Sequence, residues 1–277
     1  MTKITKNNWI TTNLSERYTN REANFLLTFT PYPFKKMSFD DAVEMTVKKI
    51  AGKYTNLYLA LSGGYDSEFI LRAFHKHGVA ITPVIVLYGN KVESAYAYKA
   101  CAELGITPIE ITITDDQFIQ YFYEKIYQRF NGIGFHGTQV LFAAEYVEKN
   151  NGTLLTGGHF IGTFDNNIAD DYASTCEWDF YTDYLYPSIN KIDFYMYTLE
   201  LSHSMFPEHN DGKWAYYKHK LLNLEYRDKT RAVYSPEVVA RLRAMLGKRE
   251  DFVHTVELEW TREEWDKIFE KWIIKND

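Results

Sequence analysis

The sequence is poor in cysteine and has no histidine arrangement that suits a metal ion. Its two cysteines, Cys101 and Cys176, lie far apart and form no Cys-x-x-Cys pair. None of the eight histidines stands in a His-Glu-x-x-His pattern or in another metal-binding spacing. These absences argue against a disulfide framework, a zinc site and an iron–sulfur cluster.

The sequence also lacks a long apolar run and an excess of basic charge. No segment is long and apolar enough to span a bilayer, and the N-terminal residues have no apolar signal core, which predicts a cytoplasmic protein without a membrane partner. Acidic residues outnumber basic residues by 37 to 31, for a net charge of -6. Broad capture of nucleic acid needs many cations, so we do not expect such a partner, although a local basic groove and an oligomeric state both stay open.

A Walker phosphate-binding loop is absent, because the sequence contains no G-x-x-x-x-G-K-[ST] pattern. A G-x-G-x-x-G pattern does occur at Gly132–Gly137. It follows a predicted helix rather than a strand, and no acidic residue stands at the distance that dinucleotide binding requires. We therefore interpret it as a flexible loop at the start of a helix.

What the sequence does contain is a strand, a glycine turn and a helix in direct succession. An apolar strand, Leu57–Leu61, runs into Ser62-Gly-Gly-Tyr-Asp-Ser67. The apolar residues that follow, Phe69, Ile70, Ala73 and Phe74, have the spacing of a buried helix face. This order of elements predicts a sharp backbone turn at the end of a strand, with a helix starting directly behind it.

The residues of this turn suit a phosphate chain. Gly63 and Gly64 let the backbone come close to a ligand, and the N–H groups at the start of the helix offer donors and a positive dipole end to an anion. Ser62 and Ser67 add hydroxyl donors, and Asp66 can hold a cation beside the phosphates. We interpret the stretch as a cradle for a polyphosphate with its magnesium; a serine–glycine turn that binds nothing is the plain alternative.

Apolar strands alternate with amphipathic helices from about residue 38 onwards. Two strands, 57–61 and 82–88, are continuous apolar runs, as in parallel sheets covered on both faces. The alternation predicts right-handed crossovers and an α/β fold with a doubly wound, mostly parallel sheet, in which ligands bind at the carboxyl ends of the strands. The further predicted strands are 107–114 and 153–156, and the predicted helices include 39–52, 92–104, 115–130, 138–149 and 192–206.

The motif Ser-Gly-Gly-Tyr-Asp-Ser resembles the SGGxDS loop of the PP-loop ATP pyrophosphatase superfamily, which includes asparagine synthetase and has an adenine nucleotide α-hydrolase-like (HUP-type) fold. The resemblance implies ATP and Mg²⁺ as cofactors and cleavage of ATP between its α- and β-phosphates. It implies that Asp66 is catalytic and binds the metal. It also implies an adenine contact from the backbone after the second strand, at Leu87 and Tyr88. The phosphate contacts that it implies are Ser62, Gly63, Gly64, Asp66 and Ser67.

A second glycine turn follows the strand at 153–156 and resembles the second conserved element of the same superfamily. The resemblance implies ligand contacts from Gly157 and Gly158 and a second magnesium ligand at Asp165. The match is imperfect, because in the family the acidic residues follow the glycine turn more closely. Asp170 and Asp171 are alternative candidates for the metal ligand. His159 in this turn is interpreted as a hydrogen-bonded loop residue, with a catalytic role left open.

Basic residues near the C-terminus and Cys176 are further candidates for catalytic roles. The family uses a C-terminal cation to neutralise the departing pyrophosphate, which points to Lys229 and Arg231, with Arg227 behind them; a solvated charge run is the alternative. Cys176 invites a thiolation mechanism, but its acidic neighbours would raise the pKa of the thiol, so we do not expect it to be catalytic.

The predicted organisation is an N-terminal extension at 1–37, an ATP-binding α/β domain at 38–235 and a mostly helical C-terminal lobe at 236–277, with strand-like segments at 25–30 and 255–260. The resemblance implies a ligase that adenylates a carboxylate or carbonyl oxygen of a small molecule and lets an amine or ammonia displace AMP. The alternatives are a tRNA-modifying or thiolating enzyme, a sulfonucleotide reductase relative and a nucleotide sensor without turnover.

Overall fold

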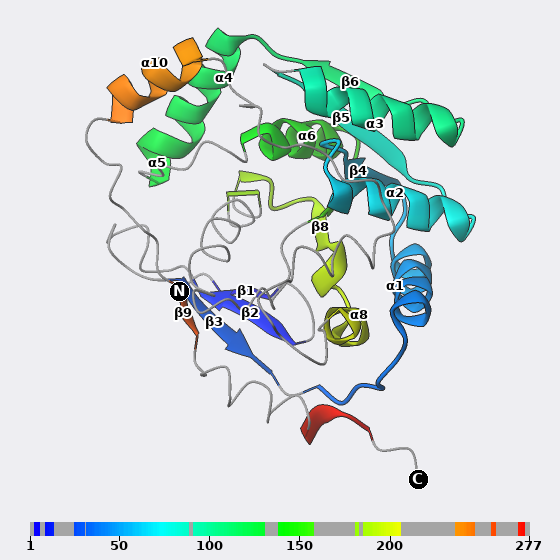
Figure 1. The fold of residues 1–277 in the computed structure, drawn as a ribbon. Coiled ribbons are helices and arrows are strands. Elements are labelled where there is room, and N and C mark those ends of the chain that lie inside the picture. The colour runs from blue at the N-terminus through cyan, green and yellow to red at the C-terminus, as the bar shows by residue number, and fades with distance from the viewer. Residues whose placement is uncertain are drawn as a thin grey trace.

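The computed structural model describes residues 3–5, 9–13, 25–30, 32–88, 91–130, 138–157, 181–182, 185–205, 236–246, 256–258 and 271–274. A five-stranded sheet forms the centre of the molecule (Figure 1). Within the described residues, no helix is both long and apolar enough to cross a bilayer.

All neighbouring strands of the central sheet are parallel. Chain order runs outward from β4 to β5 and β6, and then returns to the other side of β4 for β7 and β8. The predicted fold class, an α/β fold with a doubly wound parallel sheet, is confirmed. The spatial order is β6 (Ile109–Thr112), β5 (Thr82–Leu87), β4 (Leu57–Ala60), β7 (Thr153–Thr156) and β8 (Asn190–Asp193).

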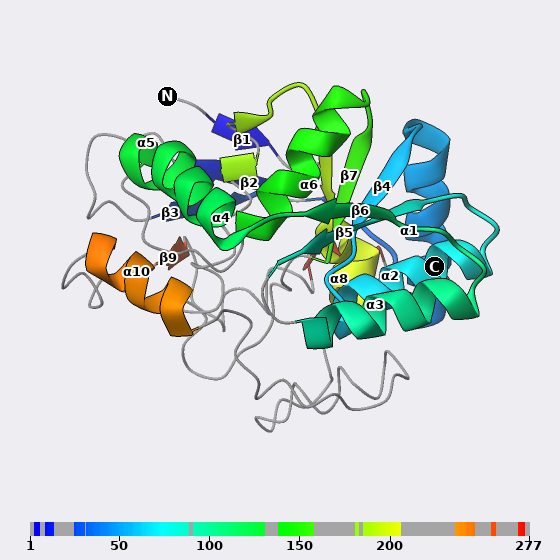
Figure 2. The same ribbon diagram turned by 90° about the horizontal axis from the view of Figure 1, so that it is seen from above.

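Helices cover both faces of the sheet (Figures 1 and 2). Side chains alternate between the two faces along a strand. In β4, Leu57 and Leu59 therefore join one apolar cluster, whereas Tyr58 and Ala60 pack against the other. The first face is covered by α1 (Phe39–Lys53), α2 (Tyr65–Lys76) and α3 (Lys91–Glu103). The second is covered by α4 (Asp115–Tyr121), the π-helix η1 (Phe122–Tyr127) and α6 (Thr138–Lys149), and α5 (Gln128–Phe130) continues from η1.

The helix starts follow from their capping residues. Ser38 caps α1: its Oγ accepts a hydrogen bond from the Asp41 N–H at 3.2 Å and donates one to Asp41 Oδ2 at 2.6 Å. Thr114 and Gln117 form a reciprocal capping box at the start of α4. These local contacts define the residues at which α1 and α4 begin.

A second, smaller sheet joins segments from both ends of the sequence. Strands β1 (Lys3–Thr5), β2 (Ile10–Asn13) and β3 (Phe25–Phe29) form an antiparallel series, and β9 (Val256–Leu258) pairs with β3 in parallel. Next to them, Phe34 exchanges backbone hydrogen bonds with Trp272 and Ile274 at 3.0 and 2.8 Å. The domain boundaries at residues 37 and 235 stay predictions, and the pairing of β3 with β9 ties the two outer segments together.

The helix α10 (Pro236–Leu246) packs on the second face of the central domain. Its buried residues Val238 and Leu242 belong to the same apolar cluster as α4 and α6. Arg241 donates a hydrogen bond to Asp116 at the start of α4, at 2.8 Å. The segment after residue 235 therefore contacts the helix that follows β6, near the carboxyl edge of the sheet.

The predicted helix over 192–206 is wrong in its first half. Ile192 belongs to β8 and pairs with Leu155, and a 3₁₀ turn, η2 (Phe194–Met196), separates it from α8 (Leu199–Ser204). Ile192, Tyr195, Met196 and Leu199 are all buried, at the spacing of a helix face. This spacing imitates a helix, although the backbone crosses from strand through a turn to helix. The predicted helix over 115–130 is interrupted by the π-helix η1.

Candidate functional site

The carboxyl ends of β4 and β7 lie side by side at the point where the strand order reverses. In doubly wound sheets, this reversal leaves a crevice in which ligands bind. The chain leaves β4 through Ser62, Gly63 and Gly64 and enters α2 at Tyr65. The glycine turn found in the sequence therefore lies at the switch point of the sheet.

The two glycines of this turn have different backbone conformations. Gly63 has a φ of 84°, in the left-handed region where a side chain would be strained. Gly64 is the N-cap residue of α2, with φ -74° and ψ 161°. The turn therefore needs glycine at position 63 for its conformation, whereas the capping geometry at position 64 is open to other residues.

The two serine hydroxyls hold the turn together. Ser67 Oγ donates to the Gly64 carbonyl at 3.1 Å and accepts from the Ser62 N–H at 3.3 Å. The Ser62 hydroxyl lies 3.2 Å from Ser67 Oγ and accepts from the Gly64 N–H at 3.2 Å. Ser67 is buried and Ser62 is exposed. The hydroxyls therefore fix the shape of the turn from inside, and Ser62 also presents its side chain to solvent.

Asp66 lies in the first turn of α2 and is fixed through its backbone. Its carbonyl accepts a hydrogen bond from the Tyr195 hydroxyl at 2.9 Å, although the two residues are far apart in sequence. The residue is half-buried, and its Oδ1 atom is buried. The carboxylate of Asp66 therefore lies at the positive end of the dipole of α2.

Gly157, at the end of β7, touches the start of α2. A Cβ at this position would lie 2.9 Å from Asp66 Cβ, 3.1 Å from the Ser67 backbone nitrogen and 3.2 Å from the Asp66 carbonyl carbon. Real Cβ atoms essentially never come as close as the first of these distances. The structure thus brings the second glycine turn against the first, and the absence of a side chain at Gly157 is what lets them meet.

Leu87 is the last residue of the neighbouring strand β5, and Tyr88 follows it directly. The Tyr88 ring is buried and stacks on Phe118 of α4, with ring centroids 4.1 Å apart and planes inclined by 11°. Burial, with a smaller contribution from Asp115, raises the pKa of the Tyr88 hydroxyl well above its usual value. The Tyr88 side chain therefore packs in the apolar core, and the expected contact with adenine would be made by the backbone of this residue.

A polar group that the sequence did not reveal lies across the switch point, at the ends of β7 and β8. Thr156 Oγ1 donates to Asp193 Oδ1 at 2.6 Å, and Lys191 Nζ lies 3.4 Å from both Asp193 carboxylate oxygens. The Lys191 and Asp193 side chains are only 3% and 7% exposed. Buried charges are rare unless they are paired. Recognising residues 190–193 as a strand would have placed both side chains on one face, and so revealed the pair.

Several predicted site residues lie outside the described residues. They are Gly158, His159, Asp165, Asp170, Asp171, Cys176, Arg227, Lys229 and Arg231, together with the loop Gly132–Gly137. Their roles stay predictions.

Asp66 fits the needs of a magnesium ion. In the part of the chain that the structure describes, no group of three or more His, Cys, Asp or Glu side chains could hold a metal. Mg²⁺ beside a nucleotide usually takes one or two protein carboxylates and completes its ligands with phosphate oxygens and water. A single carboxylate next to an anion-binding helix start therefore suits this mode of binding, and a dedicated protein cage is not needed.

Comparison with known proteins gives weak likenesses only. No protein-family model matches the sequence, and no curated protein matches it. Similar solved structures include an NMN synthetase from Francisella tularensis (13% identity, TM-score 0.38, 82% of this chain and 100% of the other). They also include an NH3-dependent NAD synthetase from Campylobacter jejuni (16%, 0.37, 77% and 95%) and a predicted subunit of tRNA methyltransferase from Methanocaldococcus jannaschii (16%, 0.36, 68% and 87%). The fold assignment therefore rests on the strand order and connections described above.

Proposed function

We propose that the chain is an ATP-dependent adenylating enzyme of the PP-loop ATP pyrophosphatase type. The observation that carries the proposal is the glycine turn Ser62–Ser67, which opens a twelve-residue helix at the switch point of a parallel sheet. The first-turn N–H groups and the positive end of the dipole of α2 favour an anion at that position. The SGGxDS resemblance implies that this anion is the phosphate chain of ATP.

In this proposal, Asp66 holds Mg²⁺ next to the phosphates. When bound, the metal neutralises charge on the phosphate oxygens and so favours loss of pyrophosphate. Gly63 and Gly64 provide close backbone approach, and the internal bonds of Ser62 and Ser67 keep the turn preorganised, so little ordering is needed when the ligand binds. Leu87 and Tyr88 provide backbone contact for the adenine ring on the β5 side.

The acceptor belongs on the other side of the turn. The ends of β7 and β8, where Thr156, Lys191 and Asp193 lie, are on the side of β4 opposite to β5, and we propose the acceptor there. A substrate carboxylate or carbonyl oxygen attacks the α-phosphorus, and the bond to the β-phosphate breaks with release of pyrophosphate. An amine or ammonia then attacks the activated carbon, loses a proton and expels AMP. Lys229 or Arg231 would neutralise the departing pyrophosphate.

The products of ATP test the proposal directly. The protein is incubated with α-labelled ATP, Mg²⁺, ammonium and a panel of small carboxylates, and the nucleotide products are separated. AMP with an equal amount of pyrophosphate is the expected result. Steady formation of ADP and phosphate would defeat the proposal, and tight ATP binding with no pyrophosphate for any substrate would favour a nucleotide sensor instead.

The substitution Asp66→Asn tests the metal site. It removes the charge and keeps the size of the side chain, so we expect binding of Mg²⁺-ATP to weaken by at least tenfold, which calorimetry can measure. Asp40→Asn is a matched control, because Asp40 is an exposed acid in the first turn of a different helix, α1. Equal effects of the two substitutions would show that the loss of binding is not specific to Asp66, and so would contradict the proposed metal site.

A further inference from the structure

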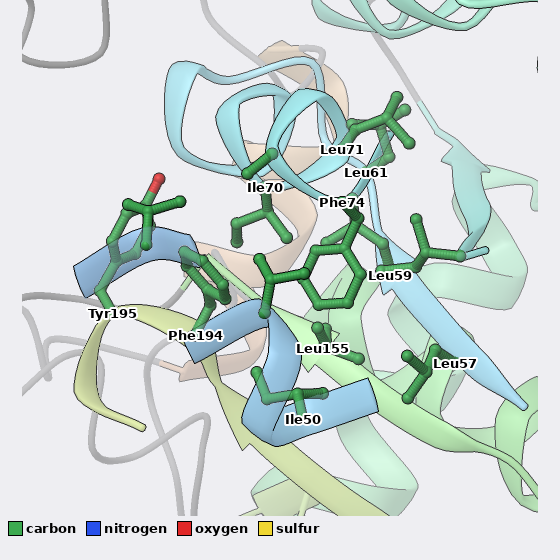
Figure 3. Close-up of a cluster of buried hydrophobic side chains, with 14 of the residues drawn as sticks. Ile50, Leu57, Leu59, Leu61, Ile70, Leu71, Phe74, Leu155, Phe194 and Tyr195 are labelled. Atoms are coloured by element: carbon green, nitrogen blue, oxygen red, sulfur yellow. The ribbon is translucent and has the colours of Figure 1, made fainter. Parts of the chain in front are cut away.

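Tyr195 connects the turn after β8 to the start of α2. It follows β8 within the 3₁₀ turn η2 and is 1% exposed. Its ring stacks on Phe69 of α2 at a centroid distance of 6.2 Å and meets the Phe194 ring edge-on at 5.2 Å. Figure 3 shows Phe194 pointing into the apolar cluster between α2 and the strands, with Tyr195 at its edge. The aromatic ring of Tyr195 therefore has a fixed place against α2.

The hydroxyl of Tyr195 contacts a backbone atom of the candidate site. It donates to the Asp66 carbonyl at 2.9 Å. Burial, with a smaller contribution from the Asp66 charge, raises the pKa of the Tyr195 hydroxyl well above its usual value. Because a carbonyl oxygen can only accept, the Tyr195 hydroxyl is the donor of this hydrogen bond.

The turn that carries Tyr195 is itself held in place. Ser202 Oγ in α8 donates to the Tyr195 carbonyl at 2.7 Å. At the start of α8, the Thr198 hydroxyl lies 2.6 Å from the Thr46 hydroxyl of α1, within the core. The position of the Tyr195 hydroxyl is thus set by two helices that take no part in phosphate binding.

We infer that Tyr195 is a positioning residue that aims the Asp66 carboxylate at the metal. Gly157 packs against the Cβ and carbonyl carbon of Asp66, and Tyr195 holds the carbonyl oxygen of the same residue. These contacts restrain the Asp66 backbone from two sides, and the backbone sets the direction of the Cα–Cβ bond. Loss of either contact lets the Asp66 carboxylate turn away from its metal-binding direction. The backbone N–H groups at the start of α2, which bind the phosphates in the proposed function, stay in place. The inference rests on the proposed function, and it adds β8 to the elements that build the site.

The test compares nucleotide binding with and without the metal. Tyr195→Phe keeps the ring and removes only the hydroxyl. Binding of α,β-methylene-ATP, which cannot be cleaved between its α- and β-phosphates, is measured by calorimetry in excess Mg²⁺ and again in EDTA. We expect the variant to bind about three- to tenfold more weakly in Mg²⁺, the effect of one hydrogen bond. In EDTA, we expect a change of less than about twofold, together with a higher Mg²⁺ concentration for half-saturation.

A matched control lies two residues further along the same turn. The Tyr197 hydroxyl interacts with Tyr54 at the end of α1, so Tyr197→Phe removes a comparable hydroxyl that does not touch the site. This variant should bind the nucleotide like the wild type in both conditions. Should Tyr195→Phe fail to fold, Ser202→Ala is the substitute, because it loosens the same turn and leaves the hydroxyl in place; a smaller, equally Mg²⁺-selective loss is expected.

The outcomes separate this inference from the proposed function. Unchanged binding by Tyr195→Phe overturns the inference, and so does an equal loss with and without Mg²⁺, because either result would give the hydroxyl a purely structural role. A wild type that does not bind the analogue at all overturns the proposed function as well. In an Asp66→Asn background, Tyr195→Phe should have no further effect on Mg²⁺-dependent binding, since the two residues act on one interaction.

Discussion

Replacing Gly157 by alanine tests whether the two glycine turns must touch. The added Cβ would lie 2.9 Å from Asp66 Cβ and 3.1 Å from the Ser67 nitrogen. Carbon atoms pack best at about 3.5–4.0 Å, so β7 and the start of α2 would have to separate by roughly 0.6–1 Å. Both neighbours are rigid, because the atoms met are the backbone of Ser67 and the first side-chain carbon of Asp66, and not the far end of a flexible side chain.

Two effects of different size follow from this separation. Overpacking of a well-packed region costs about 1–3 kcal/mol of stability, which urea unfolding can measure. A displacement of about 1 Å at a catalytic group can lower activity by about a hundredfold. We therefore expect Gly157→Ala to remain folded and to lose a much larger factor in pyrophosphate release than its stability suggests.

Gly52→Ala is the control for this experiment. Gly52 lies in the last turn of α1, and an added Cβ there would meet nothing within 4 Å. Alanine is preferred over glycine in a helix by about 0.5–1 kcal/mol, so this variant should be slightly more stable and fully active. If Gly157→Ala matched the wild type in both stability and turnover, the contact between the two turns would be unimportant and the reasoning would be refuted.

Two further predictions concern buried charges. Lys191→Met should lower the free energy of unfolding, measured in urea, by about 3–5 kcal/mol, because it leaves the Asp193 carboxylate buried without that cation. The double variant Lys191→Met/Asp193→Leu should recover much of this loss. Equal stability of the single and the double variant would contradict this prediction. The pKa of His203 is lowered by burial and by Lys36, so the folded state disfavours its protonation. The free energy of unfolding of the wild type should therefore fall, relative to that of His203→Gln, as the pH drops below about 6.5, the ordinary histidine pKa. If the difference in free energy of unfolding between the two proteins did not change with pH, this prediction would be wrong.

The features that sequence reasoning found share a local cause. The turn Ser62–Ser67 is encoded within a few residues, since glycine permits its backbone conformation and the serines bond to each other across it. The buried strands β4, β5 and β7 are likewise encoded by apolar residues within each strand. Features of this kind can be predicted from the sequence, because the residues that produce them are close together in the chain.

The features that sequence reasoning missed depend on distant partners. Strand β8 contains Lys191 and Asp193, which look solvent-exposed in the sequence, but in the structure they are buried and pair with each other, and Asp193 also accepts a hydrogen bond from Thr156. Tyr195 belongs to the candidate site through a hydrogen bond to Asp66, and nothing in the residues around Tyr195 indicates that contact. The apolar residues at 192–199 have the spacing of a helix face, and no nearby residue indicates a strand, so the sequence alone does not reveal β8.

The pairing of β3 with β9 has a consequence for biosynthesis. Most of the chain lies between these two strands, so the ribosome makes β3 long before its parallel partner emerges. Throughout that interval, one edge of the β1–β2–β3 series has unpaired backbone groups, and such edges invite pairing with foreign strands. We expect the nascent chain to be most prone to aggregation in this window, and chaperone dependence to end only when β9 docks. Pulse-labelled translation with timed protease digestion would locate that moment.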